Sequence, residues 1–335
     1  MTDKKYVVTG TPHIRDKAGV NKIMLDVIIA LVPAGIAGIY FFGIEAAMVM
    51  AVSVLACVFF EWAYKKVTKQ ACTIKDLSAV VTGVLLAFNL PSSVPLWLPI
   101  VGAFVAIIVA KELFGGIGQN FINPALAGRA FLVAAYPVLM LNVPEPIRTL
   151  GGRLVTQATP YDVMTDATPL ALMKWSEYIP TQADYINAVI GNIPGMIGET
   201  SVIALLLGFA YLLVKKIISW RIPVVFVVTV AVFTFVFGRQ GFFTGAWLYE
   251  ILLGGLFLGA IFMATDYSSS PVTPIGQIIM GFGCGVLTFA IRHYGGYPEG
   301  VAYSILLMNL FVPIIDKYTK PRVYGVNKAK KEAKA

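Results

Sequence analysis

Two stretches of the sequence match each other in register: Gly83-Val-Leu-Leu-Ala-Phe-Asn89-Leu-Pro91-Ser92-Ser93-Val-Pro95 and Gly259-Ala-Ile-Phe-Met-Ala-Thr265-Asp266-Tyr-Ser268-Ser269-Ser-Pro271. The glycine, the Ser-Ser pair and the last proline coincide without gaps. Each stretch is followed by an apolar segment that ends in Gly-Gly, at residues 115–116 and 295–296. Polar residues interrupt an apolar helix in both stretches, so we predict two broken helices. The alternative is a chance likeness between two helix ends rich in Gly, Ser and Pro.

The chain around these stretches is strongly apolar. Hydrophobic residues make up 58% of the 335 residues and charged residues 13%, whereas a soluble domain carries about 25% charged residues. A soluble fold cannot bury this much apolar surface, so the composition predicts an integral membrane protein and excludes a soluble enzyme, a secreted protein and a disordered chain. A spanning helix needs about 20 apolar residues. This criterion predicts ten spans, at residues 23–43, 45–64, 77–91, 94–114, 125–141, 199–214, 222–238, 241–265, 274–291 and 299–316.

The positive charges predict the orientation of these spans. With the N-terminus inside, most of the 26 Lys and Arg residues fall on the inner side, including those of residues 1–22, Lys111, Arg129 and the basic tail, residues 317–335. The outer side receives only Arg148, Arg153, Lys174, Arg239 and Arg292. This asymmetry predicts a multi-pass protein of the prokaryotic cell (inner) membrane with both termini cytoplasmic and no removable signal peptide. We interpret the tail as an orientation signal that faces anionic lipid, not as a nucleic-acid site.

The spacing of the matched stretches predicts how the spans are arranged. The stretches lie in the third and eighth spans, and an odd separation of five spans reverses the direction of the chain. We therefore predict an all-α polytopic membrane protein of two inverted five-helix repeats, residues 23–141 and 199–316, separated by a long extracytoplasmic loop, residues 142–198. Inverted repeats place a site at their interface, beside broken helices.

Few ionisable residues lie inside the predicted spans, and each is a functional candidate. They are Asp26, Glu61, Glu112, Glu250 and Asp266. We expect Glu61 and Glu250 to be interfacial and Glu112 to form a local ion pair with Lys111. Asp266 is the first candidate for an ion pathway, and its alternative is a helix cap. The scattered cysteines and two histidines predict no metal site.

Two further segments carry potential for ligand binding. Gly115-Gly-Ile-Gly118-Gln-Asn120-Phe-Ile-Asn123-Pro124 combines glycines, which allow a close approach, with neutral amide donors and acceptors. This combination suits a neutral heterocycle, and the alternative is a turn between helices with an Asn cap. Asp162-Val-Met-Thr165-Asp166-Ala167-Thr168-Pro169-Leu170, in the outer loop, predicts a capped turn that enters a helix over residues 170–175. Thr168 is held extended by the proline that follows it, with its hydroxyl exposed.

Four blocks of sequence resemble a known family, which comprises the D-type membrane subunits of the Rnf complex and the B-type membrane subunits of the sodium-pumping NADH:quinone reductase. The blocks are residues 82–98, 115–131, 162–170 and 254–271. In this family the last Thr of an Asp-x-x-[Ser/Thr]-Gly-Ala-Thr motif bears FMN through a phosphoester bond. The resemblance implies covalent FMN at Thr168, within a motif that includes Asp162, Thr165 and Ala167. The chain has Asp166 where the motif has Gly. The length is closer to the Rnf members of the family, because the quinone reductase members carry a longer N-terminal region.

The resemblance also implies a second, noncovalent flavin, riboflavin, near Asn120 and Asn123. It implies an electron-transfer subunit of an ion-translocating ferredoxin:NAD oxidoreductase that couples electron flow to movement of Na+ or H+. Other Rnf subunits, including Fe–S subunits and a second FMN-bearing subunit, would be its partners in the lipid bilayer. The chain alone would be inactive, because it has no Fe–S ligands and no dinucleotide fold. Arg148, Arg153, Tyr161 and Trp175 are candidate neighbours of the FMN. The rival hypotheses are a secondary transporter without flavin and a structural scaffold.

Overall fold

The computed structural model describes residues 19–147, 168–175, 178, 180–238 and 241–321. Two strands of two residues each, β1 (Phe237–Gly238) and β2 (Gly241–Phe242), form a short hairpin. All other regular elements of the described chain are helical. In chain order the helices are α1 (Val20–Val67), η1 (Ile74–Asp76), α2 (Ser78–Phe88), α3 (Trp97–Phe104), η2 (Val105–Val109), η3 (Glu112–Phe114), α4 (Pro124–Ala135), α5 (Pro137–Leu141), α6 (Pro169–Trp175), α7 (Gln182–Ile190), α8 (Val202–Val214), α9 (Arg221–Val236), α10 (Trp247–Leu252), α11 (Leu256–Leu258), η4 (Gly259–Met263), α12 (Pro274–Tyr294) and α13 (Val301–Tyr318).

Helices occupy every range that the sequence predicted to span. The first two ranges lie in one continuous element, α1, which consists of two helices joined by a kink at Gly43. Gly43 has a φ of 74° and ψ of −156°, a conformation that glycine adopts without a steric penalty. The fourth and eighth ranges each contain a π-helical turn, η2 and η4.

The helices confirm the prediction of a helical membrane protein. Four stretches of the described chain are long and apolar enough to cross a bilayer: Val20–Val67, Trp97–Phe114, Pro274–Tyr294 and Val301–Tyr318. The shorter apolar helices are Ser78–Phe88, Pro124–Ala135, Val202–Val214 and Arg221–Val236. Large apolar side chains such as Ile36, Leu55 and Leu207 are exposed on the outer faces of helices, as contact with lipid requires. The ten-span inverted layout stays a prediction.

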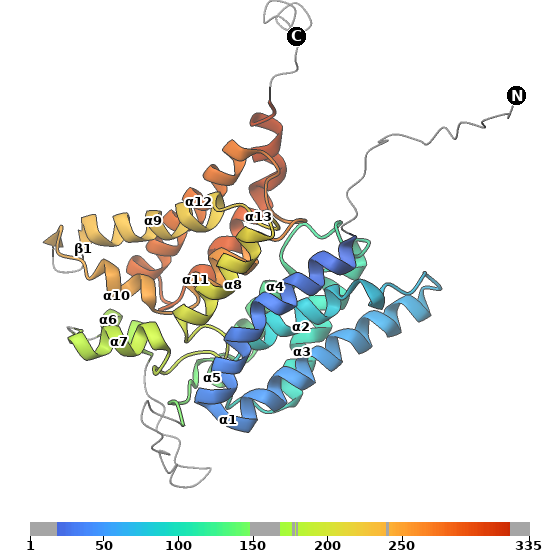
Figure 1. Ribbon diagram of the computed structural model, residues 1–335, viewed down its shortest axis with the longest axis horizontal. Helices are drawn as coiled ribbons and strands as arrows, with labels where there is room; N and C mark the ends of the chain where they lie inside the picture. Colours follow the sequence, from blue (N-terminus) through green and yellow to red (C-terminus); the bar gives the residue numbers. More distant parts are fainter. Residues whose placement is uncertain (1–18, 148–167, 176–177, 179, 239–240, 322–335) are drawn as a thin grey trace, which may run out of the picture.

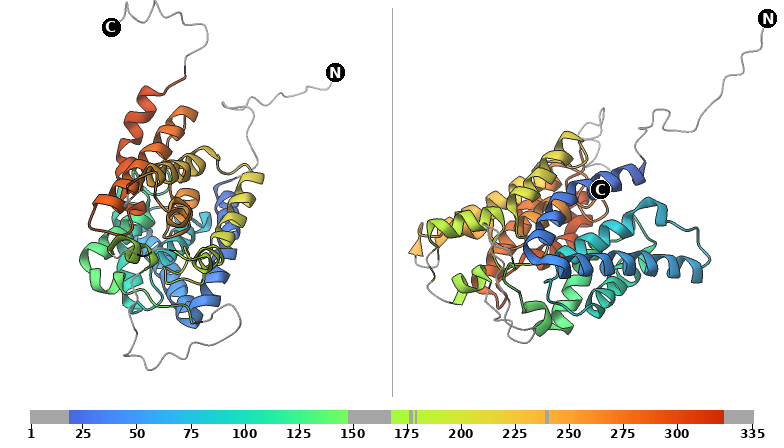
Figure 2. Two further views of the ribbon diagram at one scale, coloured as in Figure 1. Left: turned by 90° about the vertical axis from the view of Figure 1, so that its left-hand side faces the viewer. Right: turned by 60° about the horizontal axis from the view of Figure 1, so that its bottom comes forward.

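The two halves of the chain lie side by side. The helices α1 to α5 form one group and α8 to α13 the other, and α1 packs on α8 while α4 packs on α13 (Figure 1). Both ends of the described chain lie toward one end of the molecule, and α6 and α7 lie toward the other (Figures 1 and 2).

The matched stretches form two helices that stop within one residue of equivalent positions and meet in the interior. The helix α2 ends at Phe88, and η4 ends at Met263. Each is followed by a non-helical segment that carries the Ser-Ser pair. The side-chain amide of Asn89, just beyond α2, lies 3.7 Å from the Sδ of Met263. The broken helices that the sequence predicted are therefore present, and they form part of the contact between the two halves.

The segment before α8 satisfies backbone groups that the break in α2 leaves without partners. Ile197 N–H donates to the Leu90 carbonyl and Gly198 N–H donates to the Phe88 carbonyl, both at 3.1 Å. Unpaired carbonyls are costly inside a membrane protein, so these bonds stabilise the break. They need a close approach, because a Cβ at Gly198 would lie 2.1 Å from the Phe88 ring.

We expect Gly198→Ala to destabilise the protein by about 1–3 kcal/mol, since the added methyl group overpacks the interface with Phe88. The measurement is thermal unfolding of the full chain in detergent. Gly296→Ala is the matched control, because a Cβ at Gly296 meets no atom within 4 Å. Equal stability of the two variants would contradict the packing described here.

Buried ion pairs join the C-terminal part of α1 to Lys111 and to Glu112, the first residue of η3. Lys111 Nζ lies 2.6 Å from Glu61 Oε2, and Lys65 Nζ lies 2.8 Å from Glu112 Oε2. Glu61 also accepts a hydrogen bond of 2.6 Å from the Thr73 hydroxyl. One prediction is corrected here, because Lys111 and Glu112 each pair with α1 and not with each other. Glu61 and Glu250 are both buried within the protein, and their place at the membrane interface stays a prediction.

Candidate functional site

Thr168 lines a cavity of about 150 Å³ at the end of the molecule where α6 lies. We call it the Thr168 cavity. Its walls come from α4, α5, α6 and the start of α13, and they are mainly apolar. The polar and aromatic lining residues are Arg129, Thr168, Trp175, Tyr297, Glu299 and Tyr303.

The position of Thr168 is fixed by α6, which begins at the next residue. The Thr168 hydroxyl accepts a hydrogen bond of 3.3 Å from Ala171 N–H, so the predicted capped turn is present. At the other end of α6, Lys174 Nζ donates to the carbonyls of Ile291, Gly295 and Tyr297 at 3.3, 2.5 and 2.7 Å. The helix is thus attached to the loop between α12 and α13, which holds the hydroxyl at the cavity.

Arg129 and Glu299 form a buried ion pair at the inner wall of this cavity. Arg129 Nη2 lies 2.5 Å from Glu299 Oε2, and Nη1 donates to Asn89 Oδ1 at 2.9 Å. The charge pattern predicted Arg129 among the inner-side charges; the structure shows it as a buried side chain of α4, and the side of the membrane on which it lies stays a prediction. A charged residue five positions into an apolar helix is the signal that could have identified it.

Trp175, a predicted neighbour of the FMN, lines the Thr168 cavity. Arg148, Arg153, Tyr161, Asp162, Thr165 and Ala167 lie outside the described residues. The helix α7 of the same outer segment begins with a capping box, in which Thr181 and Asp184 exchange hydrogen bonds. Hydrogen bonds from the Tyr178 hydroxyl and from Thr181 hold the pKa of the exposed Asp184 below its ordinary value. The described part of the outer segment is therefore folded.

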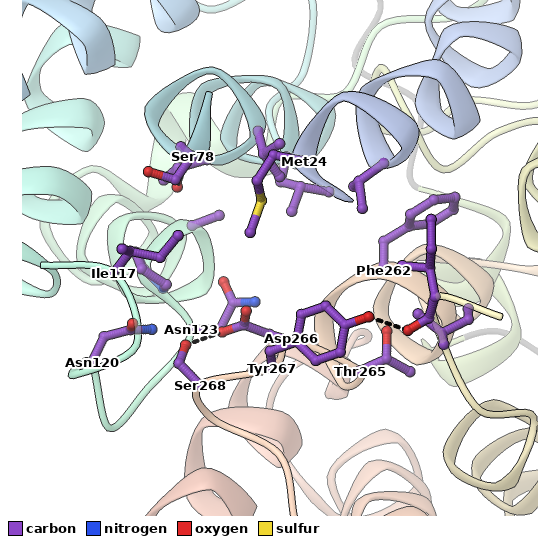
Figure 3. Close-up of a pocket in the computed structure, with 18 of the residues that line it drawn as sticks. Met24, Ser78, Ile117, Asn120, Asn123, Phe262, Thr265, Asp266, Tyr267 and Ser268 are labelled. Atoms are coloured by element: carbon purple, nitrogen blue, oxygen red, sulfur yellow. Dashed lines mark hydrogen bonds between the residues drawn. The ribbon is translucent and has the colours of Figure 1, made fainter. Parts of the chain in front are cut away.

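Asn120, Asn123 and Asp266 line a second cavity, of about 90 Å³, which we call the Asn120 cavity. They face it from the segment before α4 and from the segment after η4 (Figure 3). Met24 and Ser78 form the opposite wall. Candidate residues from both halves of the sequence are thus brought together, while Thr168 lies in a different cavity.

Each of the three polar residues has partners within the protein. Asn120 donates to the Ile122 carbonyl at 3.0 Å. Asn123 caps α4 through Leu126 N–H at 3.3 Å and donates to the Met263 carbonyl at 3.2 Å, so the capping alternative describes its geometry. Asp266 accepts from the hydroxyls of Ser268 and Ser269, both at 2.9 Å. It caps no described helix, because Thr273 caps α12.

A path of polar contacts links the two cavities. It runs from Glu299 through Arg129 and Asn89 to the sulfur of Met263, whose backbone carbonyl accepts a hydrogen bond from Asn123. The path passes between the two halves of the chain more than once, and it includes the contact between the two broken helices.

Comparisons with known proteins show which family the chain belongs to. The model of the NQR2, RnfD, RnfE family matches residues 7–325. The chain is 48% identical to the D subunit of the Na(+)-translocating ferredoxin:NAD(+) oxidoreductase complex of Acetobacterium woodii, over the whole of both chains. It is 43% identical to the D subunit of the proton-translocating ferredoxin:NAD(+) oxidoreductase complex of Clostridium ljungdahlii, over 96% of this chain and 97% of that one. The D subunit of the ion-translocating oxidoreductase complex of Halorhodospira halophila is 34% identical, over 94% of each chain. The chain belongs to the NQR2, RnfD, RnfE family.

Proposed function

We propose that the chain is the membrane-embedded electron-transfer subunit, the D subunit, of an ion-translocating ferredoxin:NAD oxidoreductase complex. The observation that carries the proposal is the Thr168 hydroxyl at the edge of an apolar cavity, in a chain whose relatives are D subunits of such complexes. The other subunits, including Fe–S proteins and a second FMN-bearing subunit, supply the remaining redox centres. The chain is not active without them.

The Thr168 cavity fits one part of an FMN bound to Thr168 through a phosphoester. A cavity of about 150 Å³ holds a benzene-sized ring. The aromatic rings of Trp175, Tyr297 and Tyr303 line this space and can pack on a flavin edge. Thr168 is the attachment point, and Asp162, Thr165 and Ala167 complete the motif. Bound here, FMN would supply one- and two-electron redox chemistry that the side chains lack.

The Asn120 cavity fits the polar edge of a second flavin, which we assign as noncovalent riboflavin. The amides of Asn120 and Asn123 offer uncharged donors and acceptors, as the edge of a flavin ring requires. A complete ring system exceeds 90 Å³, so its binding requires lining side chains such as Met24 and Ile117 to move. Asp266, half-buried beside these amides, is the candidate residue for the Na+ or H+ pathway.

Mass spectrometry of the natively purified chain tests this proposal. The peptide that contains Thr168 should carry the mass of FMN less one water, because a phosphoester forms with loss of water. Fragmentation should locate the added mass on Thr168 and leave Thr159 unmodified. Finding the peptide wholly unmodified in material from a flavin-replete host would refute covalent attachment.

A secondary transporter without flavin is the second candidate function. The meeting of two broken helices beside the half-buried Asp266 favours it. Flavin fluorescence of the denatured chain in a gel discriminates between the two functions. A fluorescent band supports the electron-transfer function, and a dark band from a host with the flavin transferase supports the transporter. A structural scaffold would show neither bound flavin nor ion dependence.

A further inference from the structure

A further cavity, of about 510 Å³, lies between the loop that joins α8 to α9 and the segment that joins η4 to α12. We call it the Lys216 cavity. Its volume is in the range of small-molecule binding sites, about 300–1,000 Å³. Tyr267 lines both this cavity and the Asn120 cavity, so the two share a wall. The polar and aromatic residues in its lining include Lys216, Ser219, Trp220, Tyr267, Ser270 and Gln277.

The Lys216 cavity lies at the end of the molecule that holds both ends of the described chain (Figure 1). In the same loop, Lys215 Nζ lies 3.8 Å from Oδ1 of Asp26, near the start of α1. Val272, in the lining, donates a backbone hydrogen bond of 3.3 Å to Asp316, near the end of α13. The charge pattern predicts this end to be cytoplasmic. We therefore expect the cavity where the headgroups of the inner leaflet meet water.

The charge at this cavity is positive. Lys216 is exposed, and its ammonium group has no ion pair or hydrogen bond with any described residue. Arg221, the first residue of α9, donates from Nη1 to Oε1 of Gln277 at 3.5 Å, so a second cation adjoins the lining. None of the described residues that line the cavity is acidic. This distribution attracts an anion.

Hydrogen bonds hold the walls of the cavity together. The Tyr267 hydroxyl donates to the Ile217 carbonyl, which joins the segment after η4 to the loop after α8. The Ser219 hydroxyl donates to Oε1 of Gln277 at 2.8 Å, which joins the same loop to α12. Lys216 precedes both contacts and has a left-handed φ of 56°, which lysine seldom adopts. The cavity is therefore formed by the fold itself, and a ligand does not have to assemble it.

An apolar stripe leads away from the cavity along α9. Trp220 lines the cavity, and Trp220, Val224 and Val228 are all exposed. They are spaced four residues apart, so they lie on one face of the helix. Exposed aromatic residues such as Trp220 and Tyr267 are typical of the boundary between membrane and water. A ligand that fills both the cavity and the stripe has an anionic head and an apolar tail, whereas a soluble anion would use the cavity alone.

We propose that the Lys216 cavity binds the headgroup of an anionic phospholipid. The phosphate lies beside Lys216 and Arg221, and an acyl chain follows the stripe that begins at Trp220. Basic pockets between membrane helices bind anionic headgroups in this way. The Ser270 hydroxyl and the Gln277 amide offer hydrogen bonds to the rest of the headgroup. The site does not depend on the proposed flavins.

Tryptophan fluorescence of the full chain in phosphatidylcholine nanodiscs tests the site. The nanodiscs contain increasing fractions of phosphatidylglycerol with brominated acyl chains, which quench a tryptophan that they contact. Each fraction is compared with the same unbrominated lipid, and brominated phosphatidylcholine is the neutral reference. We expect brominated phosphatidylglycerol to quench at a lower fraction than brominated phosphatidylcholine. The preference that depends on Lys216 should be missing from Trp220→Phe, because that variant lacks the reporter at the cavity.

Lys216→Gln should weaken the apparent affinity for brominated phosphatidylglycerol about fivefold, since one basic residue near the surface has about this effect. Lys216→Arg keeps the charge and should keep the affinity. Lys69→Gln is the matched control. Lys69 is also an exposed lysine with a left-handed backbone, φ 55°, but it lines none of the cavities described here.

Three outcomes would overturn the inference. Equal affinities of Lys216→Gln and Lys69→Gln would show that the lipid responds to charge in general and not to the cavity. Equal quenching by the two brominated lipids would show that the site does not select an anionic headgroup. Relief of quenching by inorganic phosphate, measured against chloride at equal ionic strength, would assign the cavity to a soluble anion. None of these outcomes bears on flavin at Thr168, so a failure here is distinct from a failure of the proposed function.

Discussion

Replacing Thr168 by Ala should abolish the flavin fluorescence of the denatured chain completely. The reason is chemical: the phosphoester needs a side-chain hydroxyl, and the structure places the Thr168 hydroxyl at the edge of an apolar, aromatic-lined cavity. The cost to the fold should be small, because the hydroxyl makes one long cap bond of 3.3 Å and the Thr168 carbonyl also accepts from Ala171 N–H at 2.7 Å. The measurement is in-gel fluorescence normalised to protein stain.

Two further variants serve as controls for this result. Thr168→Ser keeps a hydroxyl and should retain a fluorescent band, whereas Thr159→Ala should behave as the wild type. Thr159 is followed by a proline, as Thr168 is, but has Arg153 six residues upstream in place of an acid. If Thr159→Ala alone removed the band, the attachment site would be Thr159 and the role of the Thr168 cavity would have to be abandoned.

Replacing Lys111 by Met should produce the largest loss of stability, about 3–5 kcal/mol, because it leaves the buried Glu61 without its counter-charge. Lys111 is 3% exposed, and besides Glu61 it contacts the Ser78 hydroxyl at 2.7 Å. Methionine has a similar length, so the effect comes from charge and not from a cavity. Thermal unfolding in detergent, followed by tryptophan fluorescence, measures it.

The double variant Glu61→Gln/Lys111→Met should recover part of that loss, since the unpaired charge is removed together with its partner. Lys22→Met, at an exposed position, is the control for the loss of one positive charge. A double variant that is less stable than Lys111→Met would show that the two side chains stabilise the fold through separate contacts.

Features that depend on near neighbours in the chain are predictable from the sequence. Apolar runs predict the helix ranges, and the shared Gly, Ser-Ser and Pro predict the two broken helices, which end at Phe88 and Met263. The caps at Asn123 and Thr168 follow from a polar side chain before Pro and an apolar run, so their geometry is local.

Features that depend on distant contacts are not predictable in this way. Lys111 pairs with Glu61, fifty residues away, and adjacency in sequence points to the wrong partner, Glu112. Arg129 resembles a loop charge because its partner, Glu299, lies in the other half of the chain. Only the tertiary packing of the helices brings these groups together.

The π-helical turn η4 has a consequence for the register of the chain beyond it. A π turn accommodates one residue more than the α-helix it replaces, so the residues beyond η4 keep the direction they would have without the extra residue. If the same residues instead formed regular α-helical bonds, every later position would rotate by about 100°, the angle between successive residues of an α-helix. Asp266 would then no longer face Asn120, although no residue of the Asn120 cavity had changed. A locally less favourable turn of helix therefore determines the direction in which the Asp266 carboxylate points, several residues further along the chain.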